Sequence, residues 1–176
     1  MKRLEGKVAL ISGTARGQGR AAALRFAAEG ALVVGGDLPH EEAAETRRLI
    51  AREDGMALSP GPLDVTDEAS VRSWAAEAVD AFGGVDIVCA NAGLTGALTN
   101  RRTAHSASKG GVIALTRQPA AERAPFGIRA NCVSPGRIGT DGSRASLLAD
   151  DHPLRGIARP IPLGRTGISD DVVDAR

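Results

Sequence analysis

Tyrosine is absent from this chain, and aromatic side chains of any kind are scarce, with one tryptophan and three phenylalanines among 176 residues. There are two cysteines, Cys89 and Cys132, too few for a disulfide framework, so we expect two free thiols buried in apolar segments. No segment approaches the roughly 18 consecutive apolar residues of a membrane span, and the first residues form no secretory signal. These absences favour a cytoplasmic protein that does not enter a membrane.

Charges of the two signs nearly balance, with 22 basic and 21 acidic residues and a formal net charge of +1. Such a balance gives no reason to expect nucleic acid or an acidic membrane surface as a partner. With 43% hydrophobic and 24% charged residues, the composition is that of a folded protein. The length fits a single NAD(P)-binding domain over residues 1–176, and we predict no metal site.

Short apolar segments alternate with helical patterns along most of the chain. Strands that alternate with helices imply βαβ units, and hence a three-layer, doubly wound α/β fold of the Rossmann type. The sheet is predicted to be parallel, with five strands in the order 3-2-1-4-5. We expect strands at 7–12, 31–37, within 57–65, at 85–90 and at 128–134, and helices at 17–29, 41–53, 66–82 and 105–117.

Prolines modify this pattern at three positions. Pro60 and Pro62 interrupt the third predicted strand, which suits an edge position. Pro119 lies beyond residue 117 in the same helical pattern, where it should kink or end the helix at a cost of about 3 kcal/mol. Residues 94–104 and the segment from Pro135 onward show no clear period, so we expect irregular structure there rather than a second domain.

Three glycines, Gly13, Gly17 and Gly19, lie between the first predicted strand and the first predicted helix. Glycines at such a turn let the backbone approach a pyrophosphate, and the helix N-terminus offers N–H groups and a positive dipole. Asp37 ends the next strand, where a carboxylate can accept both hydroxyls of an adenosine ribose and would repel a 2′-phosphate. We therefore predict NAD(H) in preference to NADP(H), although the cation of Arg16 pulls slightly the other way. The alternative is a glycine-rich turn followed by a solvated aspartate.

Further motifs follow the glycine loop and Asp37 in order: Leu63-Asp64-Val65, Asn91-Ala92-Gly93, Ser106-Ala107-Ser108-Lys109 and Pro135-Gly136. With these motifs the chain resembles the short-chain dehydrogenase/reductase family. The resemblance implies cofactor-binding roles for five groups of residues. They are Ser12, Gly13, Arg16, Gly17, Gln18 and Gly19 in the loop; Asp64 and Val65 at the adenine; Asn91, Ala92 and Gly93 along the cofactor; Lys109 at the nicotinamide ribose; and Pro135, Gly136 and Thr140 at the nicotinamide.

Three of these residues also have a purely structural interpretation. Asn91 can tie neighbouring strands together, Gly93 can simply allow a turn, and Lys109 can be solvated on an exposed helix face. The sequence leaves both interpretations open.

The chain departs from the family at the position of its catalytic tyrosine. The resemblance implies a Tyr-x-x-x-Lys motif, assisted by a serine and an asparagine from earlier in the chain, but here His105 precedes Lys109 by four residues. Imidazole is a competent acid or base, and this spacing puts the two side chains on one helix face. We therefore predict His105 and Lys109 as the catalytic residues. The alternative is a histidine near a helix N-terminus without a catalytic part.

A second departure concerns length. Family members carry a whole helix and a whole strand between the turn of Gly93 and the motif at His105, whereas here only residues 94–104 lie between them. No counterpart of the serine or asparagine is found. The missing strand leaves either a vacancy in the sheet or a direct pairing of its flanking strands. Apolar surface on the Lys109 helix and on residues 85–90 should be exposed, which favours a homo-oligomer or aggregation.

The family resemblance implies an NAD(P)(H)-dependent oxidoreductase that acts on a small-molecule secondary alcohol or carbonyl. Two alternatives remain open at this point. The first is an NAD(H)-binding module without catalysis, and the second is an inactive, truncated family member.

Overall fold

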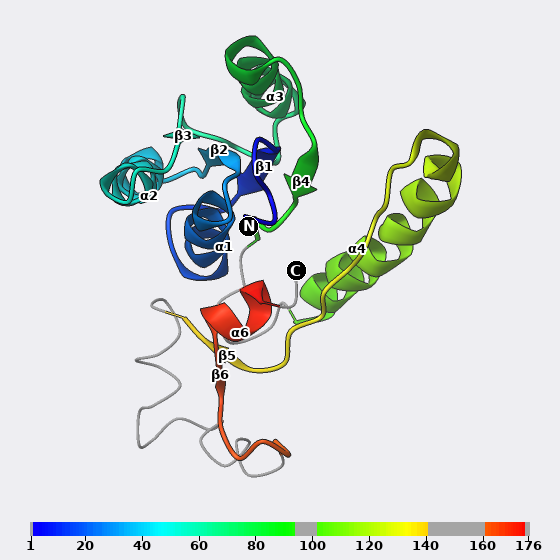
Figure 1. Ribbon diagram of the computed structural model, residues 1–176. Helices are drawn as coiled ribbons and strands as arrows, with labels where there is room; N and C mark the ends of the chain where they lie inside the picture. Colours follow the sequence, from blue (N-terminus) through cyan, green and yellow to red (C-terminus); the bar gives the residue numbers. More distant parts are fainter. Residues whose placement is uncertain (1, 94–101, 141–160, 175–176) are drawn as a thin grey trace. The chain divides into compact units, whose positions relative to one another are not determined.

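A computed structural model describes residues 2–93, 102–140 and 161–174. Strands and helices alternate from the N-terminus as expected, and the first four strands and first three helices are confirmed (Figure 1). The elements in chain order are β1 (Val8–Ser12), α1 (Gly17–Ala28), β2 (Leu32–Gly36), α2 (His40–Arg52), β3 (Ala57–Leu58), α3 (Glu68–Phe82), β4 (Ile87–Cys89), α4 (Arg102–Glu122), the 3-10 helix η1 (Ala124–Phe126), β5 (Ile138–Gly139), β6 (Gly167–Ile168) and α6 (Ser169–Val173).

The chain divides into two compact units. The first consists of Met1–Ala92 together with Gly136–Arg176, and the second is the intervening segment Gly93–Pro135. A single domain over the whole chain therefore stays a prediction, and each unit is described by itself.

A parallel sheet of four strands, in the order β3-β2-β1-β4, forms the centre of the first unit. All five residues of β1 are buried, because β1 lies between two neighbours and is covered on both faces. The third strand lies at the edge, as its prolines predict, and contains two residues. These findings confirm the Rossmann-type α/β fold.

A hydrophobic cluster lies on each face of this sheet. Figure 1 shows α1 and α2 on one face and α3 on the other. On one face, Ile11 and Val33 pack with residues of α1, α2 and α6, including Phe26, Ile50 and Val173. On the other face α3 covers the strands. Its contribution is the apolar stripe that its helical spacing predicts, with Trp74 and Ala78 packed against Val8, Leu10, Val34 and Leu63.

The fifth predicted strand, at residues 128–134, is wrong. These residues follow η1 without forming a strand, and Ile128 and Val133 have exposed side chains. A strand is stabilised by hydrogen bonds to the backbone of a neighbouring strand. The family's preceding strand has no counterpart in this chain, so residues 128–134 lack that partner. The predicted order 3-2-1-4-5 therefore reduces to four strands. Cys132, expected to be buried, is exposed for the same reason, and Cys89 is half-buried.

The helix of the second unit is longer than predicted. It begins at Arg102 rather than at residue 105 and continues through Pro119 to Glu122, so the helix does not end at Pro119, and a kink there stays a prediction. Proline removes one N–H from the helical ladder, but its carbonyl still accepts, and the N–H of Arg123 donates to the Pro119 oxygen at 2.9 Å. Residues 94–101 of the expected irregular stretch lie outside the described residues.

The segment after Pro135 contains short elements that the sequence did not reveal. Its strands β5 and β6 form a separate parallel pair, and α6 packs its residues Val172 and Val173 into the core. The Arg165 guanidinium makes two hydrogen bonds to the Asp171 carboxylate, at 2.6 and 2.9 Å, which joins the segment before β6 to α6. Residues 141–160 lie outside the described residues.

Candidate functional site

The glycine loop connects β1 to α1 and is anchored to the end of β2. The backbone N–H groups of Gly13 and Thr14 both donate to the carbonyl of Gly36, at 2.7 and 3.3 Å. Gly13 has a φ of +82°, and a Cβ on it would lie 2.8 Å from Nδ2 of Asn91. A Cβ on Gly19 would overlap the carbonyl oxygen of Gly13. The loop therefore packs so closely that these two positions admit only glycine.

The N-terminus of α1 differs from those of the other helices in the first unit. Its N-cap, Arg16, makes no side-chain cap, and no acidic residue lies in its first turn. In contrast, Asp67 caps α3, and α2 begins with Glu41 and Glu42. A helix N-terminus with no side-chain cap keeps its positive dipole end available for an anion. This arrangement, with glycines where side chains would fill the approach, fits the pyrophosphate of a dinucleotide.

Asp37 follows β2 and faces the loop. Its Oδ2 accepts the N–H of Ala15 at 2.9 Å, and its Oδ1 accepts the N–H of Leu38 at 2.8 Å. Each carboxylate oxygen can accept a further bond, and the side chain is partly exposed, so a ribose could still be bound. Asp37 thus has a structural role, tethering the loop, in addition to the predicted recognition of the ribose.

Ser12 and Asn91 join the ends of the two central strands. The Ser12 hydroxyl accepts the N–H groups of Asn91 and Ala92, each at 3.0 Å, and the Asn91 amide donates to the Ser12 carbonyl at 3.1 Å. The structural interpretation of Asn91 is therefore correct. Because β1 and β4 are parallel, their carboxyl ends meet here, beside the glycine loop.

A hydrogen-bond network that the sequence did not reveal ties the loop to α2. The Arg20 guanidinium donates from Nε to Thr46 Oγ1 at 2.9 Å and from Nη2 to the carbonyl oxygens of Ala15 and Glu42. The Thr46 hydroxyl in turn donates to the carbonyl of Thr14 at 2.7 Å. No short motif joins residues so far apart in the sequence.

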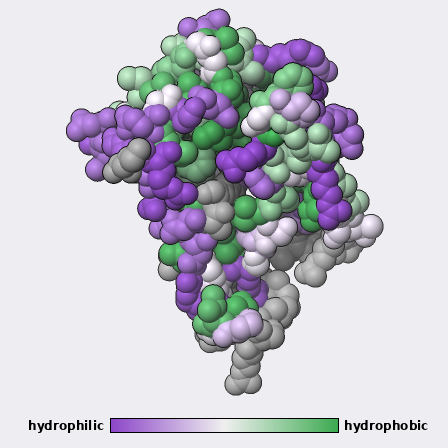
Figure 2. All heavy atoms as spheres, turned by 45° about the vertical axis from the view of Figure 1, so that its right-hand side comes forward, coloured by the Kyte–Doolittle hydropathy of each residue, from purple (hydrophilic) through white to green (hydrophobic). Residues whose placement is uncertain are grey.

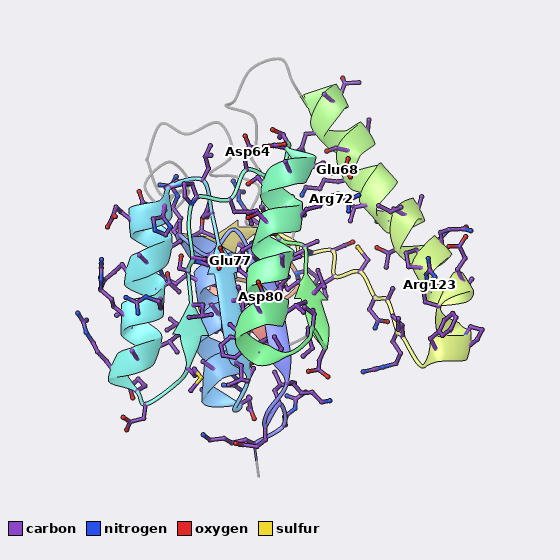
Figure 3. All side chains as sticks on the ribbon, turned by 90° about the horizontal axis from the view of Figure 1, so that it is seen from above. Asp64, Glu68, Arg72, Glu77, Asp80 and Arg123 are labelled. Carbon is purple, nitrogen blue, oxygen red and sulfur yellow. The ribbon has the colours of Figure 1, made fainter. Side chains whose placement is uncertain are left out.

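Asp64 and Val65 lie on the approach to α3 (Figure 3). Asp64 Oδ1 accepts the Thr66 hydroxyl at 2.7 Å and the Thr66 N–H at 2.9 Å. These bonds, the hydroxyl's first, lower the pKa of Asp64. Val65 is exposed, as an adenine contact requires.

The segment after β5 returns to the glycine loop. An added Cβ at Gly17, whose φ is +58°, would lie 3.4 Å from the Thr140 side chain. Thr140 and the loop are therefore neighbours, although they are far apart in the sequence. Gly136 lies at the start of this returning segment. The cofactor-binding predictions that belong to the first unit are Ser12, Gly13, Arg16, Gly17, Gln18, Gly19, Asp37, Asp64, Val65, Asn91, Ala92, Gly136 and Thr140.

The predicted catalytic residues belong to the second unit. His105 and Lys109 lie on α4 at the helical spacing that the sequence predicts, His105 partly exposed and Lys109 exposed. The carbonyl of His105 accepts the Ser108 hydroxyl at 2.8 Å. Gly93 and Pro135, the two ends of the unit, are the remaining predicted site residues.

Apolar side chains are exposed on both units, as the missing helix and strand predict. Figure 2 shows hydrophobic side chains open at the surface among hydrophilic ones. In the first unit, Val88 is 67% exposed, and Val79 of α3 is 48% exposed. Val88 pairs in register with Leu10, so it extends the cluster beneath α3. In the second unit the exposed side chains are Val112, Ile113, Leu115, Phe126, Ile128 and Val133.

The described ranges contain neither a candidate metal site nor a candidate membrane span. No group of three or more His, Cys, Asp or Glu side chains there could hold a metal ion. No helix in the same ranges is long and apolar enough to cross a membrane.

Comparison with known proteins identifies the family. Residues 7–103 match the family model described as short chain dehydrogenase, and residues 95–176 match the model described as enoyl-(acyl carrier protein) reductase. The chain belongs to the short-chain dehydrogenase/reductase family. The family resemblance predicted from the motifs is confirmed.

Relatives in this family carry different names. The chain is 30% identical to the 3-oxoacyl-acyl-carrier-protein reductase FabG of Thermotoga maritima, over 97% of this chain and 88% of that protein. It is 32% identical to 3beta-hydroxysteroid dehydrogenase 1 of Eggerthella lenta, over 98% of this chain and 85% of that protein. A solved short-chain type dehydrogenase/reductase from Mycobacterium marinum has a TM-score of 0.84 and 28% identity, with 98% of this chain and 87% of that chain covered.

The alignments also bear on the length of the chain. The comparison with the Thermotoga protein extends over 223 positions, although this chain has 176 residues. The relative therefore has residues for which this chain has no counterpart. This agrees with the missing segment that the motif spacing indicates.

Proposed function

We propose that this short-chain dehydrogenase/reductase binds NAD(H) at the glycine loop, in preference to NADP(H). The observation that carries the proposal is the loop itself, in which Gly13 and Gly19 admit no side chain beside a helix N-terminus without a side-chain cap or acid. The preference rests on Asp37, whose charge disfavours a phosphate on the ribose that it would hold. Asp64 and Val65 would contact the adenine, and Asn91 and Ala92 would lie along the cofactor.

The reaction we propose is the interconversion of a secondary alcohol and a carbonyl on a small molecule. The nicotinamide, when bound, supplies or takes the hydride. His105 of this chain would move the proton: a ring nitrogen would accept it from the hydroxyl as an alcohol is oxidised and return it to the oxygen as a carbonyl is reduced. Lys109, one turn further along α4, would donate hydrogen bonds to the nicotinamide ribose and orient it. The family resemblance assigns Pro135, Gly136 and Thr140 to the nicotinamide and Gly93 to a position along the cofactor.

A second candidate function is an NAD(H)-binding module without catalysis. The observation that favours it is the complete absence of tyrosine from the chain. An inactive, shortened family member is the third outcome, and it differs from the module because it would bind no cofactor.

The test of cofactor binding is a calorimetric titration with NADH and, in parallel, NADPH. Micromolar binding of NADH with weaker binding of NADPH is expected. Gly17→Val fills the approach to the pyrophosphate and should abolish binding, whereas Gly61→Val is the matched control, because nothing lies within 4 Å of a Cβ there. Asp37→Ala should narrow the difference between the two cofactors. Failure of wild-type protein to bind either cofactor would refute the proposal.

The test of catalysis is NADH oxidation with 3-oxoacyl thioesters and 3-ketosteroids, the substrate classes suggested by the relatives. Turnover by wild-type protein that is lost in both His105→Ala and His105→Tyr would establish His105 as the acid or base. Turnover that rises in His105→Tyr would show that imidazole is a poor substitute for the phenol. NADH binding with no turnover in any variant would leave the binding module.

We also propose self-association and a cytoplasmic location. The uncovered apolar side chains around Val88 support association with a second copy. The low cysteine content, two residues among 176, supports a reducing compartment.

A further inference from the structure

Arg16 is the residue of the glycine loop that argues against a preference for NAD(H), because its cation could attract a 2′-phosphate. The structure pairs that cation with an acid. Arg16 Nη1 lies 3.9 Å from Oε2 of Glu42, in the first turn of α2. Both side chains are about half exposed, at 59% and 51%, so either could also meet a ligand.

The backbone on both sides of this ion pair is held by one side chain. Arg20 Nη2 donates to the carbonyl of Glu42 at 3.2 Å and also to the carbonyl of Ala15, the neighbour of Arg16. Arg20 Nε binds Thr46 one turn further along α2. These bonds fix the separation between the start of α1 and the start of α2. They therefore also fix the distance that the Arg16 and Glu42 side chains must span to meet.

The carboxylates of Asp37 and Glu42 adjoin Arg16 at this corner of the site, where the other cation, Arg20, already donates to Thr46 and to two carbonyl oxygens. Asp37 accepts the N–H of Ala15, next to Arg16, and Glu41 and Glu42 open α2. A phosphate on a ribose held by Asp37 would face these carboxylates, and it would find Arg16 already paired. Electrostatic attraction between exposed groups falls when a competing counter-ion is held nearby.

We propose that Glu42 is a second determinant of cofactor choice, because it engages the Arg16 guanidinium and withholds it from a 2′-phosphate. This inference rests on the proposed binding of NAD(H). Asp37 excludes the phosphate directly, whereas Glu42 acts through Arg16, so Glu42 is a positioning residue.

The experiment is a double-mutant cycle read by titration with NADH and NADPH at low ionic strength, where exposed charges are least screened. The variants are Glu42→Gln, Arg16→Gln and the double variant. Glu45→Gln is the matched control, because it removes the same charge from α2 at a residue paired with Arg48. Glu42→Gln should tighten NADPH binding about three- to tenfold and leave NADH binding nearly unchanged. The control should change neither.

The cycle separates the mechanism from a general charge effect. The gain in NADPH affinity should disappear when Arg16→Gln is added, because the released guanidinium produces it. Three results would overturn the inference: an equal gain in NADPH affinity with and without Arg16, an equal gain in the Glu45→Gln control, or no gain at all. In each of these cases, NADH binding by wild-type protein would still uphold the proposed function. Absence of NADH binding by wild-type protein would overturn both.

Discussion

The two units of this chain contain similar apolar side chains but differ in what those side chains contact. In the first unit, Ile11 is completely buried and Val33 nearly so, within a cluster formed by strands and helices. In the second unit, Leu115 of α4 is 67% exposed. The comparison teaches that apolar content and helical spacing suffice to form a helix, whereas burial requires neighbouring elements, and the family's adjoining helix and strand have no counterpart here.

Glycines give the same contrast. Gly13 and Gly19 have other backbone or side-chain atoms where a Cβ would lie, so the packing of the first unit requires them. Gly110 and Gly111 of α4 have nothing within 4 Å of a Cβ. The packing around these glycines therefore separates the glycine loop from α4, independently of the apolar side chains.

The largest expected effect is that of truncating a buried side chain in the first unit. Ile11→Ala should lower the free energy of unfolding by about 2–5 kcal/mol, because it leaves a cavity in the sheet core. Leu115→Ala in α4, the matched truncation of an exposed side chain, should change it by about 0.5 kcal/mol or less. Urea denaturation followed by circular dichroism measures both. Equal costs would contradict the contrast between the units.

Crowding the glycine loop should produce the next largest effect. Gly19→Ala places a methyl group against the Gly13 carbonyl, and we expect a loss of about 3 kcal/mol in stability together with loss of NADH binding. Gly84→Ala serves as the control, because nothing lies within 4 Å of its Cβ. A Gly19→Ala protein as stable as wild type would show that the loop is looser than described.

A charge on the uncovered patch tests whether the exposed apolar surface of the first unit has a partner. Val88→Asp should weaken self-association about tenfold or more, since burial of an unpaired carboxylate is costly. Analytical ultracentrifugation over a range of concentrations measures the dissociation constant, with Val65→Asp as an exposed control away from the patch. An unchanged dissociation constant would exclude β4 from the interface.

A glycine-to-alanine substitution in α4 should raise the stability of the helix, whereas Gly19→Ala in the glycine loop should lower the stability of the protein. Gly111→Ala should stabilise α4 by about 1 kcal/mol, because alanine restricts the unfolded chain and nothing obstructs its Cβ. The helical ellipticity should rise, or the helix should melt at a higher temperature. A loss of ellipticity would contradict the open surroundings of a Cβ at Gly111.

The smallest effect concerns Asp86, which tethers β1 to the turn before β4. The N–H of Val8 and then the ammonium of Lys7 lower the pKa of the Asp86 carboxyl. A lowered pKa contributes stability above the carboxyl's unfolded value of about 3.9, and this contribution is lost as the pH falls through the folded value. Wild-type protein should therefore melt slightly above Asp86→Asn at pH 7, and the difference should shrink as the pH is lowered through the folded pKa of Asp86. A constant difference across that range would contradict the assignment.

The sequence predicted the first unit well because its elements are specified by local patterns. Three local patterns were sufficient to predict the position of an element. They are the apolar segment of β1, the stripe that includes Trp74 and the two prolines that follow the edge strand β3. The strand at residues 128–134 could not be predicted correctly in the same way. Its apolar pattern is real, but a strand also needs a neighbour, and single-sequence reasoning does not show whether one is present.

The candidate site shows the same limit. Gly13 and Asp37 belong to a compact motif, so the sequence located them. Arg20 and Thr46 come together only through the packing of α1 on α2, and neither lies in a recognisable pattern. The hydrogen bond from the Asn91 amide to the Ser12 carbonyl joins two strands that are far apart in the sequence, so only the fold brings these two groups within bonding distance.

The burial of Val172 and Val173 against α1 has a consequence for the order in which the protein can be made. These residues complete a core whose other members, such as Phe26, are synthesised far earlier. The nascent first unit must therefore wait, with one side of α1 uncovered, while the ribosome produces all of Gly93–Pro135 and the residues after it. During that interval the apolar side of α1 is a surface that a chaperone can bind, and the cluster around Phe26 is complete only after translation has passed α6.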